Sequence, residues 1–134
     1  MNKTNKDFLK RFKRFFILDE GLPEWLMKSR EKQIKKRLDP KFRELVSLLD
    51  QFAGEFNVKV CYPLYYSEKE FHWVDLYIPN KLAVIVSSEW EVIRRVAGVK
   101  GHKERNLKDY NVLELIDWDS PVEMLEKIAK KLDE

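Results

Sequence analysis

Asp75 is the residue of this chain whose position best suits metal chemistry. It interrupts the hydrophobic stretch 73–78, which has the composition of a β-strand. A turn at Pro79-Asn80 and a second apolar run, 82–86, follow directly. Metal-dependent cleavage of a phosphodiester needs carboxylates from adjoining strands to hold Mg²⁺ beside the scissile phosphate, often with a lysine that orients water. Asp75 is therefore the first candidate metal ligand.

Three helices are predicted ahead of the strand that carries Asp75. Residues 5–18 place phenylalanine and leucine at helical spacing with lysine and arginine between them, which indicates a basic amphipathic helix. Pro23 opens a second helix that ends near Leu38. Asp39-Pro40 has the sequence of an N-cap and first turn, so a third helix is expected over residues 40–53.

The spacing of apolar residues changes from helical to alternating after this third helix. Strands are predicted around residues 56–60, over 71–76 and over 82–86. Because the run 82–86 is apolar almost throughout, it is typical of a central strand covered on both faces, and helices are expected to flank the sheet. A helix over 102–110, a strand over 112–116 and a closing helix that starts with the capping box at Ser120 complete the order ααα-βββ-α-β-α.

Composition predicts one compact domain. The 134 residues are 44% hydrophobic, which is enough for one core and too little chain for two. No run reaches the ~20 apolar residues of a membrane span, and the first residues are polar, so a cytoplasmic location without membrane association is predicted. Cys61 is the single cysteine, and it is predicted to be a buried structural thiol and not a catalytic residue.

The net charge of +3 is unevenly distributed along the chain. Residues 1–37 contain twelve Lys and Arg against five Asp and Glu, whereas residues 38–134 contain fourteen against eighteen. The composition therefore divides the chain into a basic N-terminal helical arm, 1–38, and an α/β core, 39–134.

Two consecutive segments resemble the central strands of small PD-(D/E)XK nuclease-like proteins. They are Trp73-Val74-Asp75-Leu76-Tyr77-Ile78-Pro79 and Leu82-Ala83-Val84-Ile85-Val86-Ser87-Ser88. The similar branches are the very-short-patch-repair endonuclease-like, DUF559-like and RAP-domain-like ones, whose strands read roughly VDF…P…LAIEVDG. The later segment 101–115 also resembles their helix-then-strand pattern, and the resemblance covers about residues 44–132. It implies a restriction-endonuclease-like core, with a mixed four-stranded sheet flanked by helices.

The resemblance also implies roles for individual residues. It gives Asp75 as a metal ligand and Glu44, on the third helix, as an accessory acid. The central strand departs from the family, because Ile85-Val86-Ser87 stands where Glu-x-Lys or Glu-x-Asp belongs, and the second carboxylate ligand is missing there. The very-short-patch branch also deviates at this strand and uses a backbone carbonyl and nearby histidines. A similar site here would draw on Ser87, Glu89 and His102.

The first functional hypothesis is a nucleic-acid-binding protein with a nuclease-like fold and an incomplete catalytic site. In this hypothesis basic side chains contact the phosphates of DNA or RNA, so binding weakens steeply with salt. Mg²⁺ or Mn²⁺ is expected only if the site is catalytic. The candidate phosphate contacts are Lys10, Arg11, Lys13, Arg14, Lys32, Lys35, Lys36, Arg37, Arg94, Arg95 and Arg105.

Two alternatives stay open. One is an active Mg²⁺- or Mn²⁺-dependent endonuclease that uses Asp75 with Glu44, with Lys103 or Arg105 stabilising the developing phosphate charge. The other is a protein-interaction module or homo-oligomer, formed through the N-terminal helices and through Trp90 or Trp118. Structural roles compete with all three hypotheses: an isolated aspartate at a strand end commonly caps a turn or meets a nearby arginine, and charged runs on helices are commonly solvated faces. Neither His72 nor His102 has the spacing of a zinc ligand.

Overall fold

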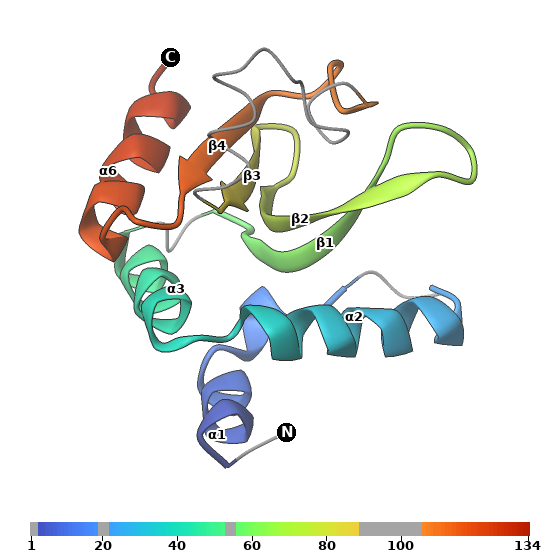
Figure 1. The fold of residues 1–134 in the computed structure, drawn as a ribbon, viewed down its shortest axis with the longest axis horizontal. Coiled ribbons are helices and arrows are strands. Elements are labelled where there is room, and N and C mark those ends of the chain that lie inside the picture. The colour runs from blue at the N-terminus through green and yellow to red at the C-terminus, as the bar shows by residue number, and fades with distance from the viewer. Residues whose placement is uncertain (1–2, 19–21, 53–55, 89–105) are drawn as a thin grey trace.

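The computed structural model describes residues 3–18, 22–52, 56–88 and 106–134. Within these ranges the chain is an α/β fold of a four-stranded mixed sheet and four α-helices. Figure 1 shows the sheet above the long helix α2, with α3 and α6 together at one end of the sheet and α1 below α2. The predicted α/β class and mixed four-stranded sheet are confirmed.

The N-terminal region folds as two short elements where the sequence predicted one helix. Helix α1 (Lys3–Arg11) ends before Phe12, whose φ of −111° and ψ of 36° leave the helical region, and the 3₁₀ turn η1 (Lys13–Phe15) follows. The predicted continuous helix over 5–18 is therefore wrong. The break lets Phe12 and Phe15 both enter the core while Arg14, between them, reaches Asp50 of α3 at 2.8 Å.

The next two helices begin where their sequence signals predicted. Helix α2 (Glu24–Arg37) starts directly after Pro23, and α3 (Pro40–Phe52) starts at Pro40. Asp39 caps α3, because its Oδ1 accepts a hydrogen bond from the Phe42 backbone N–H at 2.8 Å. The apolar stripe of α3 is buried as far as Leu49, and Phe52 at the end of the helix is exposed.

The sheet places β3 between two neighbours, as its apolar composition predicted. The strand order is β1-β2-β3-β4, with β1 antiparallel to β2, β2 antiparallel to β3, and β3 parallel to β4. Residues 82–85 of β3 are all buried. The strands are β1 (Lys59–Tyr65), β2 (Phe71–Ile78), β3 (Leu82–Ser87) and β4 (Val112–Ile116).

Side chains of β3 contribute to two separate hydrophobic clusters. Leu82 and Val84 belong to the larger one, together with side chains from η1, α2, α3 and the closing helix α6 (Pro121–Leu132). Ala83 and Ile85 belong to a smaller one, with Leu107. Because Phe12 and Phe15 are part of the larger cluster, the Phe-rich side of the N-terminal region packs on the core of its own chain.

Arg30 fastens α2 to the sheet from inside the protein. It is 4% exposed, and its guanidinium donates to the backbone carbonyls of Cys61 at 2.9 Å, Val60 at 2.7 Å and Phe16 at 2.5 Å. The φ of Cys61 is +53°, in the left-handed region, and the carbonyls on either side of this bend are two of the acceptors. Burial lowers the pKa of Arg30 to about 10, so it is still charged at neutral pH.

The C-terminal part follows the prediction closely. Strand β4 has the expected bounds, and Ser120 and Glu123 form the expected capping box at the start of α6. Of the helix expected over 102–110, residues 102–105 lie outside the described part, and residues 107–109 form a turn. Within the described ranges, no helix combines the length and apolar character that a membrane crossing requires.

Candidate functional site

The carboxylate of Asp75 lies against strand β3, as the sequence predicted. The paired residues of β2 and β3 extend from Ile78↔Leu82 to Leu76↔Val84. Directly beyond this last pair, Asp75 Oδ2 accepts a hydrogen bond from the backbone N–H of Val86 at 2.7 Å. The aspartate side chain therefore takes the place of a main-chain acceptor where the two strands separate.

Arg37, the last residue of α2, meets the other oxygen of the same carboxylate. Its Nε lies 3.2 Å from Asp75 Oδ1, as an ion pair without hydrogen-bond alignment. The side chains of Arg37 and Asp75 are 25% and 18% exposed, and the Arg37 guanidinium lies over the ring of Phe42 at 5.1 Å from its centre. Both oxygens of Asp75 are thus engaged, one by an amide and one by a cation.

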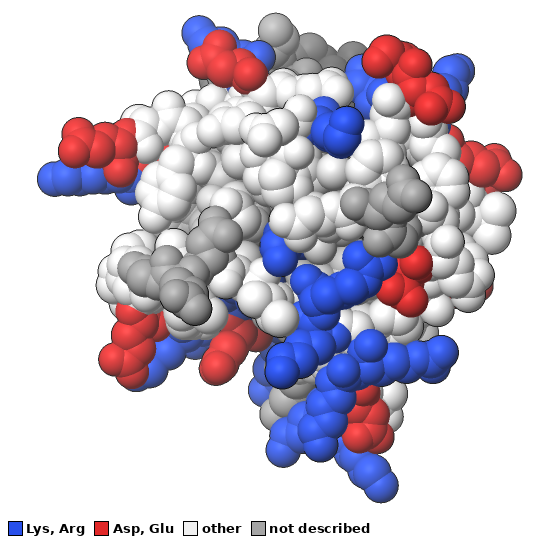
Figure 2. Space-filling view, turned by 180° about the vertical axis from the view of Figure 1, so that it is seen from behind, with Lys and Arg blue, Asp and Glu red and all other residues white. Residues whose placement is uncertain are grey.

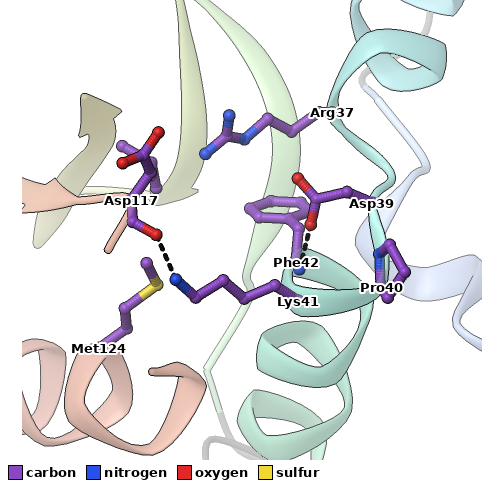
Figure 3. Close-up of a pocket in the computed structure, with 8 residues that line it drawn as sticks. Arg37, Asp39, Pro40, Lys41, Phe42, Asp117 and Met124 are labelled. Carbon is purple, nitrogen blue, oxygen red and sulfur yellow. Dashed lines mark hydrogen bonds between the residues drawn. The ribbon is translucent and has the colours of Figure 1, made fainter. Parts of the chain in front are cut away.

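A pocket of about 300 Å³ lies beside this ion pair, at the junction of α2 and α3. Figure 3 shows Arg37 and Lys41 reaching into it from the side of the helices, with Asp117 and Met124 on the opposite side. The Lys41 ammonium donates to the backbone carbonyl of Asp117. The full lining is Arg37, Asp39, Pro40, Lys41, Phe42, Val86, Asp117 and Met124.

The charges around Asp75 do not favour a metal ion. A divalent cation needs several oxygen ligands with a net negative charge, and Asp75 already has the opposite charge of Arg37 beside it. Among the residues that the structure describes, no group of three or more His, Cys, Asp and Glu side chains is arranged to hold a metal. A cation bound to Asp75 would lie close to the guanidinium of Arg37, and the like charges would repel.

Of the other candidate catalytic residues, Glu44, Ser87 and His72 lie in the part of the chain that the structure describes. Glu44 is exposed on α3 and does not line the pocket. Ser87, which is 2% exposed, lies at the end of β3, where its carbonyl accepts from the N–H of Asp117 at 2.9 Å. His72 Nε2 lies 2.8 Å from Asn106 Nδ2. Lys103, Glu89 and His102 lie outside the described residues.

The predicted phosphate contacts fall into two groups. Arg14 and Arg37 are held in ion pairs with Asp50 and Asp75. The other candidates in the described residues are exposed, and none of them forms an ion pair with a described carboxylate; they are Lys10, Arg11, Lys13, Lys32, Lys35 and Lys36. Figure 2 shows lysine and arginine side chains gathered on the lower part of one face, at the level where Figure 1 places α1. Arg94, Arg95 and Arg105 lie outside the described residues.

Sequence reasoning missed the buried role of Arg30 and the pocket residues Lys41 and Asp117. Arg30 carried a usable signal, because it stands four residues after Leu26 and four before Ile34, on the apolar side of α2. Lys41 and Asp117 meet across the pocket from positions 76 residues apart, and no local pattern indicates that contact. Of the two tryptophans proposed for an interaction surface, Trp118 is exposed and Trp90 lies outside the described residues.

Comparison with known proteins adds no family assignment: no protein-family model, no curated protein and no solved structure matches the chain.

Proposed function

We propose that the chain binds nucleic acid through the exposed lysines and arginine of its N-terminal helices, and that the site at Asp75 does not cleave the bound strand. The observation that carries this proposal is the exposed set Lys32, Lys35 and Lys36 on α2, together with the exposed basic residues of α1 and η1. Figure 2 shows lysine and arginine side chains gathered on one face. Such side chains release counterions when they neutralise phosphates, and this release drives binding that is independent of sequence.

The state of the basic residues supports the binding half of the proposal. A lysine paired with a carboxylate is already neutralised, whereas Lys32, Lys35 and Lys36 have no ion pair with any carboxylate in the described part of the chain. The face of α2 opposite these lysines carries Leu26, Arg30 and Ile34, which are buried. The helix is therefore held firmly by one side while the other side presents positive charge to solvent.

The contacts of Asp75 support the non-cleaving half of the proposal. Metal-assisted cleavage needs a group of oxygen ligands whose negative charge attracts the ion. Asp75 instead accepts from Val86 and pairs with Arg37, and the candidate partner residue Ser87 is buried. The proposed role of Asp75 is to join the end of α2 to the sheet.

A restriction-endonuclease-like core is part of the same proposal. A PD-(D/E)XK-like origin is supported by the mixed four-stranded sheet and by the contact between Asp75 and β3, the strand on which the missing second carboxylate would stand. In this proposal Arg37 supplies, next to Asp75, the positive charge that a metal ion supplies in an active nuclease.

Binding and cleavage assays on the same purified protein test the proposal. Fluorescence anisotropy measures the affinity for labelled DNA and RNA over a series of salt concentrations. The logarithm of the association constant is expected to fall linearly with the logarithm of the salt concentration. Incubation of the same nucleic acids with Mg²⁺ or Mn²⁺ is expected to leave them intact. Absence of binding to every DNA and RNA at low salt would refute the first half. Metal-dependent cleavage that Asp75→Asn abolishes would refute the second half.

A further inference from the structure

We propose that the nucleic acid bound by this chain is single-stranded, and that Trp25 stacks on one of its unpaired bases at the start of a lysine stripe on α2. This inference rests on the proposed function and adds the class of substrate and the residue that selects it. The stripe consists of Trp25, Lys28, Lys32 and Lys36, and all four side chains are exposed.

Trp25 is exposed although it touches other aromatic rings. Its side chain lies in the first turn of α2 and is 59% exposed, with its ring centre 6.3 Å from that of Phe71. Phe71, at the start of β2, in turn lies 5.2 Å from Tyr65 and 5.4 Å from Trp73 between ring centres. These four residues form an aromatic cluster that supports the indole from one side and leaves much of its surface open to solvent.

Helix geometry places the lysines in line with this indole. At about 100° per residue, Lys32 and Lys36 lie within about 20° of Trp25 around the helix axis, and Lys28 lies about 60° away. The stripe is about 16 Å long, at about 1.5 Å of rise per residue. Lys28 is paired with Glu24 at 3.5 Å, but both side chains are largely exposed, so this pair is weak and can open for a phosphate.

The combination of a ring and a row of cations distinguishes single strands from duplexes. Proteins that bind single strands combine positive charge along the backbone with aromatic side chains that stack on the bases. In a duplex the flat faces of the bases are stacked on one another and closed to the protein, so a duplex offers only its phosphates to the lysines. An exposed tryptophan at the end of a lysine stripe therefore adds binding energy for unpaired bases alone.

The charges of the neighbouring β1–β2 hairpin indicate the path of the bound nucleic acid over the protein surface. Glu68 and Glu70 flank Lys69 in the exposed turn between β1 and β2, next to Phe71, so this turn has a net negative charge that repels phosphates. Figure 1 shows this turn at the same side of the molecule as the N-terminal end of α2. The strand is therefore expected to run from Trp25 toward Lys36, away from the turn.

Trp118 provides a matched control for a test of Trp25. It is 56% exposed, almost the same fraction as Trp25, but it stands in the segment between β4 and α6 and is not a residue of the lysine stripe. The experiment measures the affinity of Trp25→Ala, Trp25→Phe and Trp118→Ala for a labelled single strand and for a duplex of equal length. Circular dichroism and thermal melting check that each variant is folded.

Trp25→Ala is expected to weaken single-strand binding by about tenfold, the loss of one stacked base, and to leave duplex binding unchanged. Trp25→Phe keeps a ring and is expected to recover most of the loss, while Trp118→Ala changes neither affinity. If Trp25→Ala does not fold, quenching of tryptophan fluorescence by the single strand is read instead: it is expected to fall in Trp25→Phe and to persist in Trp118→Phe.

Equal effects of Trp25→Ala on single strands and duplexes, or no effect on either, would overturn this inference and leave the proposed function intact. A change in the sedimentation of the free protein, with unchanged nucleic-acid affinity, would also overturn it and would assign Trp25 to an interface between copies of the chain. Absence of binding to any nucleic acid by the unsubstituted protein would refute both proposals together.

Discussion

Both faces of α2 carry basic residues, but the one on the inner face is buried and hydrogen-bonded, whereas those on the outer face are exposed. On the inner face, Arg30 is buried and donates to three backbone carbonyls. On the outer face, Lys32 and Lys36 are exposed and have no ion pair with a described carboxylate. Charge in this helix therefore stabilises the fold on one side and is available to a partner on the other. Arg37 stands between these extremes, since it is partly exposed and paired with Asp75.

Substitution of the inner arginine should have the largest effect. Arg30→Ala removes a charged donor and leaves the carbonyls of Phe16, Val60 and Cys61 without that partner, so we expect a loss of about 3 to 5 kcal/mol in the free energy of unfolding. Arg30→Lys keeps the charge but not the planar fork of donors and should lose less. Urea denaturation measures both values. A loss below about 1 kcal/mol for Arg30→Ala would show that the three contacts do not hold α2 to the sheet.

Removal of the Asp75 carboxylate should have an intermediate effect. Asp75→Ala leaves the Val86 N–H without its acceptor and Arg37 without its ion pair, and we expect a loss of about 2 kcal/mol in the free energy of unfolding, measured by urea denaturation. Asp75→Asn retains an oxygen for Val86 and should lose less.

The matched control for Asp75 is Glu44→Gln, an exposed carboxylate, which should change stability by no more than about 0.5 kcal/mol. Mg²⁺ is expected to leave the melting temperature of the unsubstituted protein unchanged, because a ligand that binds the folded state would raise it. A rise in melting temperature with Mg²⁺ that Asp75→Asn abolishes would instead support a metal site.

Neutralisation of the outer lysines should change binding and leave stability intact. For the triple substitution Lys32→Gln, Lys35→Gln, Lys36→Gln, we expect the slope of log affinity against log salt to fall by about 2 to 3, at roughly 0.7 to 0.9 for each phosphate that is no longer neutralised. Anisotropy titrations measure the slope. The control pair Lys108→Gln, Lys130→Gln removes exposed charges elsewhere and should change the slope little. Equal effects of the two sets would mean that net charge, and not the face of α2, governs binding.

The exposed ion pair between Arg14 and Asp50 should contribute least. Its side chains are 42% and 43% exposed, and such pairs contribute about 0.2 to 1 kcal/mol. Asp50→Asn is therefore expected to lower the free energy of unfolding by less than about 1 kcal/mol, with a smaller loss at high salt. A larger loss that is insensitive to salt would show that Arg14, like Arg30, stabilises the fold as a buried residue does.

The sequence predicted the elements that carry local signals. Asp39-Pro40 and Ser120 mark the starts of α3 and α6, and the apolar run that begins at Leu82 marks the central strand. The contact of Asp75 with β3 was also predictable, because one turn joins the two strands. The α/β class and the mixed sheet follow from these signals.

The sequence could not predict the features that depend on distant partners. The break of the first helix at Phe12 follows from the way its phenylalanines fit a core made by later residues. The pairing of Arg37 with Asp75 joins residues whose separation along the chain gives no periodic signal. Trp25 is exposed, although the next residue, Leu26, is fully buried. In each case tertiary packing, and not local propensity, decides the outcome.

The carbonyls that hold Arg30 have a consequence for synthesis of the protein. A ribosome completes α2 before it makes Val60 and Cys61, the residues that supply two of the three acceptors. At roughly 5 to 20 residues per second, the nascent helix waits for seconds with a charged side chain on its apolar face. Until β1 is made, the carbonyl of Phe16 is the one acceptor of the three that Arg30 can reach, and β1 then supplies the other two.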